Sequence, residues 1–166
     1  MNRPLSRDIP VVARRSEDQP FSEDPKKSFT MPARFYNDPE IFELEKEAIF
    51  YNSWLYVGHA SQLQNPGEYI TAEIHEQNVF IVRSRDGELR GFYNVCAHRG
   101  HELLSGCGKT KLIVCPYHAW AYDLDGSLKK ARNSENVEGF NKCDFSLTPV
   151  QVEIFCGMVF VYRWKN

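Results

Sequence analysis

Two short segments, each pairing one cysteine with one histidine, constrain this chain more than any other feature. The first is Cys96-Ala97-His98, and the second is Cys115-Pro116-Tyr117-His118, with residues 99–114 between them. A cysteine and a histidine so close in sequence cannot easily chelate one tetrahedral zinc ion, whose ligands usually pair as C-x2–4-C and H-x3–5-H. The spacing suits two metal ions side by side, with both cysteines on one ion and both histidines on the other.

This donor set is typical of a [2Fe–2S] cluster in which two histidines replace two of the cysteines. We therefore predict a [2Fe–2S] cluster, one per chain, held by Cys96, His98, Cys115 and His118. The alternatives are a structural zinc site and ordinary buried side chains that bind nothing. The type, order and spacing of all four residues favour the cluster, and both segments follow apolar runs.

Longer stretches around these residues resemble a known family. CAHRGHELLSGCGK and CPYHAWAYDLDGSL are similar to the Rieske domain of Rieske non-haem iron oxygenase large subunits, of the aromatic-ring-hydroxylating dioxygenase type. The resemblance runs from about Met31 to Val161 and includes WLYVGHASQL. The segments HAW and KKARNSENVEGF most resemble the subgroup that acts on quaternary ammonium compounds such as carnitine and glycine betaine.

The resemblance implies a function in electron transfer. A reductase using NAD(P)H, or a ferredoxin, would reduce the cluster, which would supply a mononuclear Fe(II) site in a catalytic domain or a neighbouring subunit of a homotrimer. Nothing after Phe160 could form the two-His-one-carboxylate triad of such a site. We therefore expect no catalytic residue here and no oxygenase activity by this chain alone. A free-standing Rieske-type ferredoxin is the alternative, although such a carrier needs neither the N-terminal helix nor ARNSENVEGF.

Composition and charge exclude several other functions. The chain has 166 residues and a net charge of −2, so it has no general positive field for nucleic acid. No apolar run approaches the roughly 18 residues that span a membrane, and the N-terminal sequence lacks the apolar core of a signal peptide. Five cysteines, with two expected as ligands, do not fit a secreted disulfide framework. We expect a cytoplasmic protein without nucleic-acid or membrane partners.

The periodicity of the sequence predicts a mainly β fold. Asp38 is a predicted N-cap, Pro39 suits the first helical position, and one α-helix is expected to end near Asn52. Short apolar runs then follow, namely WLYVG, EYITAEI, NVFIVRS, LRGFYNV, KLIVC, WAYDLDG, SLKKA, VQVEIF and MVFVY. Asp86-Gly87 and Asp125-Gly126 are hairpin signals between such runs. The pattern indicates a Rieske-type antiparallel β-sandwich, with the two ligand loops at hairpin tips.

The chain is expected to divide into four parts: a flexible arm at 1–30, a segment with the helix at 31–53, the Rieske [2Fe–2S] domain at 54–161, and a short tail at 162–166. Tyr117 and Trp120 are expected to shield the cluster from water. Gly100 and Gly106 are expected to allow tight turns. Three cysteines and one histidine are expected to have no part in the site: Cys107, Cys143, Cys156 and His59. Arg99, Lys109 and Lys111 form either a solvated rim or a landing site for an acidic electron donor, and His101 could line it.

Respiratory Rieske proteins, which the loop pair also resembles in outline, have a serine hydroxyl where this chain has Trp120, and a disulfide where it has His101 and Tyr117. Fewer hydrogen bonds to the sulfur atoms leave a reduced cluster less stabilised. We therefore predict a reduction potential toward the bottom of the range for Rieske centres, which is roughly −150 to +300 mV.

Overall fold

The computed structural model describes residues 22–27, 31–134 and 136–162. The chain forms two compact units, residues 1–48 and 49–166. Most of the predicted arm at 1–30, and the tail after Tyr162, lie outside the described residues. Within the arm, the described part contains a short 3-10 turn, η1, at Pro25–Lys27. No helix in the described ranges is long and apolar enough to cross a membrane.

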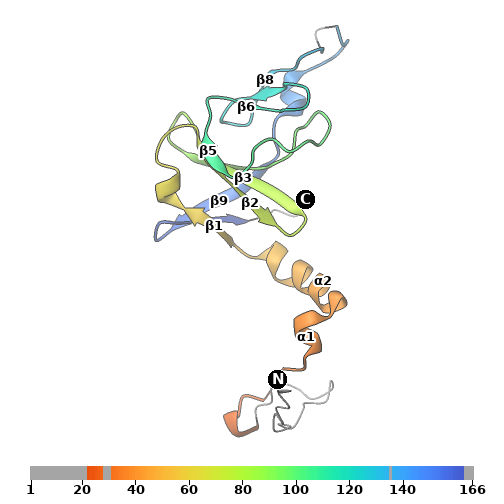
Figure 1. The fold of residues 1–166 in the computed structure, drawn as a ribbon, viewed down its shortest axis with the longest axis vertical. Coiled ribbons are helices and arrows are strands. Elements are labelled where there is room, and N and C mark those ends of the chain that lie inside the picture. The colour runs from red at the N-terminus through yellow and green to blue at the C-terminus, as the bar shows by residue number, and fades with distance from the viewer. Residues whose placement is uncertain (1–21, 28–30, 135, 163–166) are drawn as a thin grey trace, which may run out of the picture. The chain divides into compact units, whose positions relative to one another are not determined.

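The helical unit contains α1, Arg34–Asn37, and α2, Pro39–Ala48 (Figure 1). Asp38 separates them because a residue before proline is driven to an extended conformation. Its Oδ1 accepts a hydrogen bond from the Glu40 N–H at 2.9 Å, which confirms the predicted N-cap. The predicted helix was too long at its C-terminal end. α2 stops at Ala48, and a 3-10 turn, η2, follows at Phe50–Asn52.

The second unit contains ten antiparallel strands in two sheets. They are β1 Leu55–His59, β2 Glu68–Ile74, β3 Gln77–Arg83, β4 Leu89–Tyr93, β5 Cys107–Lys109, β6 Ile113–Val114, β7 Ala121–Tyr122, β8 Leu128–Lys130, β9 Pro149–Phe155 and β10 Met158–Tyr162. The larger sheet has the order β1-β10-β9-β4-β3-β2-β5, and the smaller has the order β6-β7-β8. Two further 3-10 turns are η3 Ala60–Gln62 and η4 Lys142–Phe145. Every predicted apolar run contains a strand, whereas β5 was not predicted.

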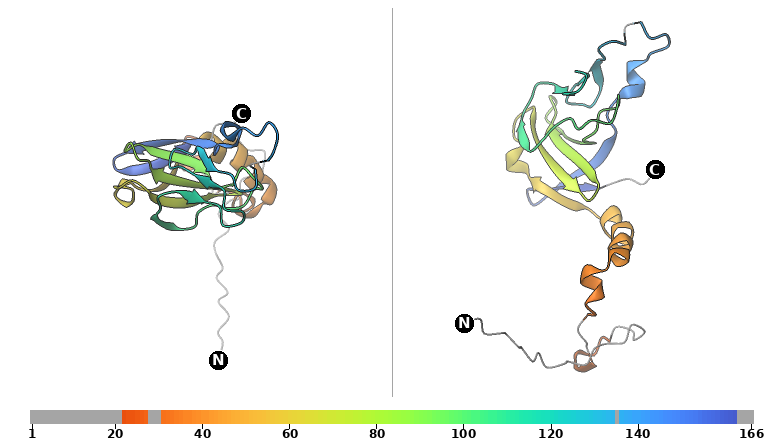
Figure 2. Two further views of the ribbon diagram at one scale, coloured as in Figure 1. Left: turned by 90° about the horizontal axis from the view of Figure 1, so that it is seen from above. Right: turned by 45° about the vertical axis from the view of Figure 1, so that its right-hand side comes forward.

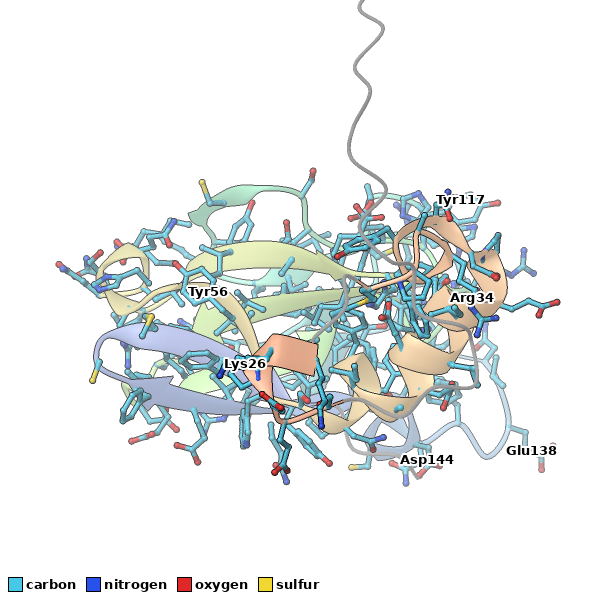
Figure 3. The ribbon with its side chains drawn as sticks, turned by 90° about the horizontal axis from the view of Figure 1, so that it is seen from below. Lys26, Arg34, Tyr56, Tyr117, Glu138 and Asp144 are labelled. Atoms are coloured by element: carbon cyan, nitrogen blue, oxygen red, sulfur yellow. The ribbon has the colours of Figure 1, made fainter. Side chains whose placement is uncertain are left out.

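The strands form three layers, and β3 in the middle layer is buried on both faces. Val79 and Ile81 of β3 belong to one core, which also includes residues of β1, β9 and β10. Phe80 and Val82 belong to a second core, which the ligand loops and the small sheet share. β9 and β10 lie on one side of β2–β4 (Figures 2 and 3), and β6–β8 lie at one end of the domain (Figure 1). This confirms the predicted antiparallel sandwich.

Both predicted hairpin turns are present. Gly87, between β3 and β4, has φ 88°, and Gly126, between β7 and β8, has φ 85°. Such positive φ values favour glycine over residues with a Cβ. Two further turns, at His75 and Cys156, also have positive φ, 52° and 51°. These two were not predicted, because their sequences lack the usual Asn-Gly or Asp-Gly pair.

Candidate metal centre

The first ligand loop follows β4 and contains Cys96. The Cys96 N–H donates to the His101 carbonyl at 2.8 Å, and the Gly100 N–H donates to the Cys96 carbonyl at 2.9 Å. Gly100 has φ 69°, as predicted for a tight turn. A single antiparallel bridge between Val95 and Glu102 closes the loop. The loop therefore resembles a hairpin only locally, because β4 and β5 on either side of it pair with other strands.

The second ligand loop joins β6 to β7 as a true hairpin and repeats the same backbone pattern. The Cys115 N–H donates to the Trp120 carbonyl at 2.8 Å, and the Ala119 N–H donates to the Cys115 carbonyl at 3.0 Å. Ala119 has φ 57°, in the place that Gly100 has in the first loop. Each cysteine therefore anchors the start of a loop of the same length and the same hydrogen bonding.

These loops bring the four predicted ligands together. Cys96 and Cys115 are buried, and the rings of His98 and His118 lie edge to face, with their centroids 4.8 Å apart. Burial raises the pKa of the Cys96 thiol, and the neighbouring Cys115 thiol adds to this rise. Burial, and then the adjacent His118, lower the pKa of His98. The shift favours the neutral imidazole of His98, which is the form that binds a metal ion.

One buried polar atom of the site lacks a hydrogen-bond partner. His118 Nδ1 is buried, and it has no hydrogen-bond partner within the described part of the chain. Buried polar atoms in native proteins almost always have a partner, so an orphaned ring nitrogen in the same loop as the buried Cys115 thiol fits a metal ligand. Two thiols and two imidazoles are also the donor set of a [2Fe–2S] cluster with mixed ligands. The residues present therefore fit this cofactor.

Aromatic residues surround the histidines unequally. Trp120 is buried and stacks on His98, with ring centroids 4.7 Å apart and an interplanar angle of 12°. Phe140 and Phe145 pack edge to face with this indole. Tyr117 lies 3.8 Å from the His118 ring centroid, but it is 57% exposed. Trp120 thus shields the site from water as predicted, whereas Tyr117 remains largely in solvent.

Tyr122 is a residue of the site that the sequence analysis missed. Its hydroxyl lies 3.1 Å from Cys96 Sγ, and its oxygen accepts a hydrogen bond from the Ala97 N–H at 3.1 Å. Tyr122 is fully buried, which, together with Cys96, raises its pKa. When Cys96 is a thiolate, the phenol must donate the hydrogen bond. The sulfur atoms thus have a donor that the prediction of few hydrogen bonds did not include.

Asn94 is a second missed residue, and its side chain holds the end of the first loop through hydrogen bonds. Its Oδ1 accepts hydrogen bonds from the N–H groups of Leu103, at 3.2 Å, and Leu104, at 3.0 Å. Its Nδ2 donates to the Leu104 carbonyl at 2.6 Å and to Glu102 Oε1 at 3.1 Å. Asn94 is buried, so its amide joins β4 to the far side of the loop.

The remaining candidates lie outside the site or at its edge. His59 Nδ1 accepts a hydrogen bond from the Ser61 N–H at the start of η3, which is the predicted structural role. Gly106 has φ 64°, and its carbonyl accepts a hydrogen bond from the Thr71 N–H. The six other candidates are all exposed: Arg99, His101, Cys107, Lys109, Lys111 and Cys143. Among the described residues, no three His, Cys, Asp or Glu side chains could hold one metal ion.

Comparison with known proteins agrees with this geometry. Residues 53–141 match the model of the Rieske [2Fe–2S] domain family. The carnitine monooxygenase oxygenase subunit of Acinetobacter pittii is 51% identical over 94% of this chain and 42% of its own length. The glycine betaine monooxygenase oxygenase subunit of Pseudomonas aeruginosa is 36% identical over 84% of this chain and 32% of its own length.

A solved structure of a quaternary ammonium Rieske monooxygenase, studied for carnitine oxidation and inter-subunit electron transfer, superposes with a TM-score of 0.82. It is 48% identical over 94% of this chain and 42% of that chain. The chain thus spans less than half the length of these relatives. Matched loops, fold and sequence agree, and the chain belongs to the Rieske [2Fe–2S] domain family.

Proposed function

We propose that this chain is the electron-accepting domain of a Rieske oxygenase subunit that acts on a quaternary ammonium substrate such as carnitine or glycine betaine. The observation that supports the proposal is the pair of matching loops, which contain two buried thiols and the orphaned His118 Nδ1. The names of the most similar relatives support the substrate class. The chain's own part in this function is to hold a [2Fe–2S] cluster with Cys96, His98, Cys115 and His118.

When bound, such a cluster takes up and releases one electron at a time. The residues determine where and how readily this happens. Cys96 and Cys115 are buried, whereas His98 and His118 are partly exposed. The histidine side is therefore the side that a redox partner can approach closely. Trp120 keeps water from one face of His98, and the Tyr122 hydroxyl is placed to stabilise negative charge on Cys96 Sγ.

The partners follow from this role. A reductase using NAD(P)H, or a ferredoxin, would supply the electrons. A mononuclear iron site, in a catalytic domain or in a neighbouring subunit of a homotrimer, would receive them. The exposed Arg99, Lys109 and Lys111 are placed to attract an acidic donor. All five cysteines are free thiols, and we propose a reducing, cytoplasmic location on that ground.

Ligation is tested by substitution of the cysteines. Cys96→Ser and Cys115→Ser should each abolish the visible absorbance and the Rieske EPR signal, because oxygen donors replace thiolates poorly at this site. Cys107→Ser is the matched control, since Cys107 is an exposed thiol between the two loops and should leave both signals intact. A full-intensity Rieske EPR signal in Cys115→Ser would remove that residue from the ligand set.

Electron supply to a catalytic region of this subgroup is tested by domain exchange. This chain would replace the matching region of the Acinetobacter pittii oxygenase subunit, and carnitine consumption would be measured with its reductase. We expect carnitine-dependent turnover by the exchanged protein and none by the present chain alone. Turnover by the chain alone, in the reduced state with oxygen and carnitine, would show that a catalytic site lies within it.

A further inference from the structure

The layer formed by strands β1, β10 and β9 carries apolar side chains on both of its faces. Inward residues such as Val159 and Val161 belong to the core against β2–β4. The outward residues are also apolar, and we call them the outer aromatic face. They are Trp54, Tyr56, Phe155, Met158, Phe160 and Tyr162. An antiparallel sheet with one solvated side normally carries polar residues there.

Strand register places these six side chains on one continuous surface. Tyr56 of β1 pairs with Phe160 of β10, and their ring centroids are 6.0 Å apart. Trp54 and Tyr162 approach at 5.4 Å. Phe155 of β9 pairs with Met158 of β10, and paired residues point to the same side of a sheet. The face therefore crosses all three strands.

This surface is open to solvent. Phe155 is 68% exposed, Tyr56 is 59% exposed and Trp54 is 44% exposed. The polar residues Gln151 and Glu153 of β9 lie on the same side, opposite Tyr162 and Phe160. Contiguous apolar patches with a polar border mark interaction sites, and Trp, Tyr, Phe and Met are the residues enriched in protein interfaces.

We propose that the outer aromatic face docks the remainder of the oxygenase subunit, that is, the region that the relatives have outside the part matched here. This inference rests on the proposed function. The relatives supply the occupant, because this chain spans only 42% of the Acinetobacter pittii subunit. Position supports it as well. Tyr162, the last residue of β10, itself belongs to this face.

The location also suits the flow of electrons. The outer aromatic face belongs to the layer β1-β10-β9, whereas the ligand loops adjoin the small sheet on the other side of β2–β4. Tyr56 and Tyr117 lie well apart in Figure 3. Docking at the outer aromatic face therefore leaves His98 and His118 accessible to a separate redox partner.

A native thiol reports directly on whether the face is covered. Cys156 is exposed in the turn between β9 and β10, next to Phe155, while Cys107 is exposed on β5. Maleimide labelling of each thiol would be followed by mass spectrometry. The labelling rate of each thiol would be compared between this chain and the same chain joined to the rest of the Acinetobacter pittii subunit. We expect Cys156 to react about tenfold or more slowly in the longer protein, with Cys107 unchanged. Equal rates for Cys156 would overturn the proposal.

Substitution at the face provides the second measurement. Phe155→Glu should leave the Rieske EPR signal of the short chain intact, because Phe155 is exposed there, and should restore Cys156 labelling in the longer protein. Val137→Glu, at an exposed apolar residue elsewhere, is the control and should restore nothing. If the joined protein is insoluble, the two regions are co-expressed as separate chains. Failure of the short chain to capture the other region then overturns the proposal.

Two outcomes separate this inference from the proposed function. A normal Rieske EPR signal with an unprotected Cys156 would refute the docking face and leave cluster binding standing. Absence of the signal from the unmodified chain would refute the proposed function itself. Sedimentation of the short chain gives the remaining test, since a dimer abolished by Phe155→Glu would assign the face to a second copy instead.

Discussion

Asn94 provides a sharp test of how the first ligand loop is held. Asn94→Leu keeps a side chain of similar size but removes all four side-chain hydrogen bonds. The N–H groups of Leu103 and Leu104 lose their acceptor, and the Leu104 carbonyl loses a donor. Leu103 is buried and Leu104 is partly buried, so water cannot fully replace these bonds.

The expected magnitude follows from these lost bonds. A buried donor left without a partner costs about 1–3 kcal/mol. Two N–H groups left without an acceptor therefore lower the free energy of unfolding by about 2–6 kcal/mol, out of the roughly 5–15 kcal/mol that is typical of a whole domain. Because the affected residues lie at the end of the loop that contains Cys96 and His98, the loop should also release its cofactor faster.

Anaerobic denaturant unfolding, followed by tryptophan fluorescence, measures the free energy of unfolding. The rate at which visible absorbance is lost measures cofactor release. Asn78→Leu is the matched control, because Asn78 is exposed on β3 and only its backbone carbonyl contacts Asn94. The control should change stability by less than about 0.5 kcal/mol. If Asn94→Leu shifts the unfolding free energy no more than Asn78→Leu, the amide network does not hold the loop.

Four further substitutions probe the site and its scaffold. Tyr122→Phe removes the hydroxyl beside the Cys96 sulfur and should lower the reduction potential measured by voltammetry; an unchanged potential would show that the hydroxyl does not act on the sulfur. Ala119→Gly relieves a positive φ and should raise the free energy of unfolding by about 0.5–1 kcal/mol, while Gly100→Ala should lower it by a similar amount. Burial alone would raise the pKa of Asp123, but a backbone N–H and the Arg85 guanidinium outweigh it and hold that pKa below 3.8. Its stabilising effect is therefore present above about that pH and is lost as the pH falls through the lower folded-state value. Asp123→Asn should flatten the acid side of the stability profile, and an unchanged profile would contradict this.

The four candidate ligands could be identified from the sequence because their chemistry is local. Each cysteine and its histidine lie within one short loop, so spacing alone indicated the metal arrangement. Tyr122 and Asn94 could not be found in this way. Tyr122 reaches Cys96 only because β7 packs beside the first loop, and Asn94 acts on residues that follow that loop. A weak signal existed for Tyr122, since it lies two positions from Trp120 in the same predicted apolar run, WAYDLDG, where alternation puts both on one side.

Alternation of apolar residues predicted the strands but not their partners. The run at 78–84 is apolar on consecutive positions, and β3 is accordingly buried on both faces. The run MVFVY has the same appearance, yet β10 is covered on one face only. β5 was missed because Cys107–Lys109 contains no large apolar residue and exists only through pairing with β2.

The double burial of β3 has a consequence for how the domain opens. One strand supplies side chains to both cores, so neither core can loosen without disturbing the strand that the other requires. Amide protons of Phe80, Ile81 and Val82 should then exchange with solvent only when the whole domain unfolds. Helices α1 and α2 and the described residues of the loop at 132–141 lack such a shared strand and can exchange through local fluctuations. The rigidity of the ligand loops therefore depends on a strand that contains none of the candidate ligands.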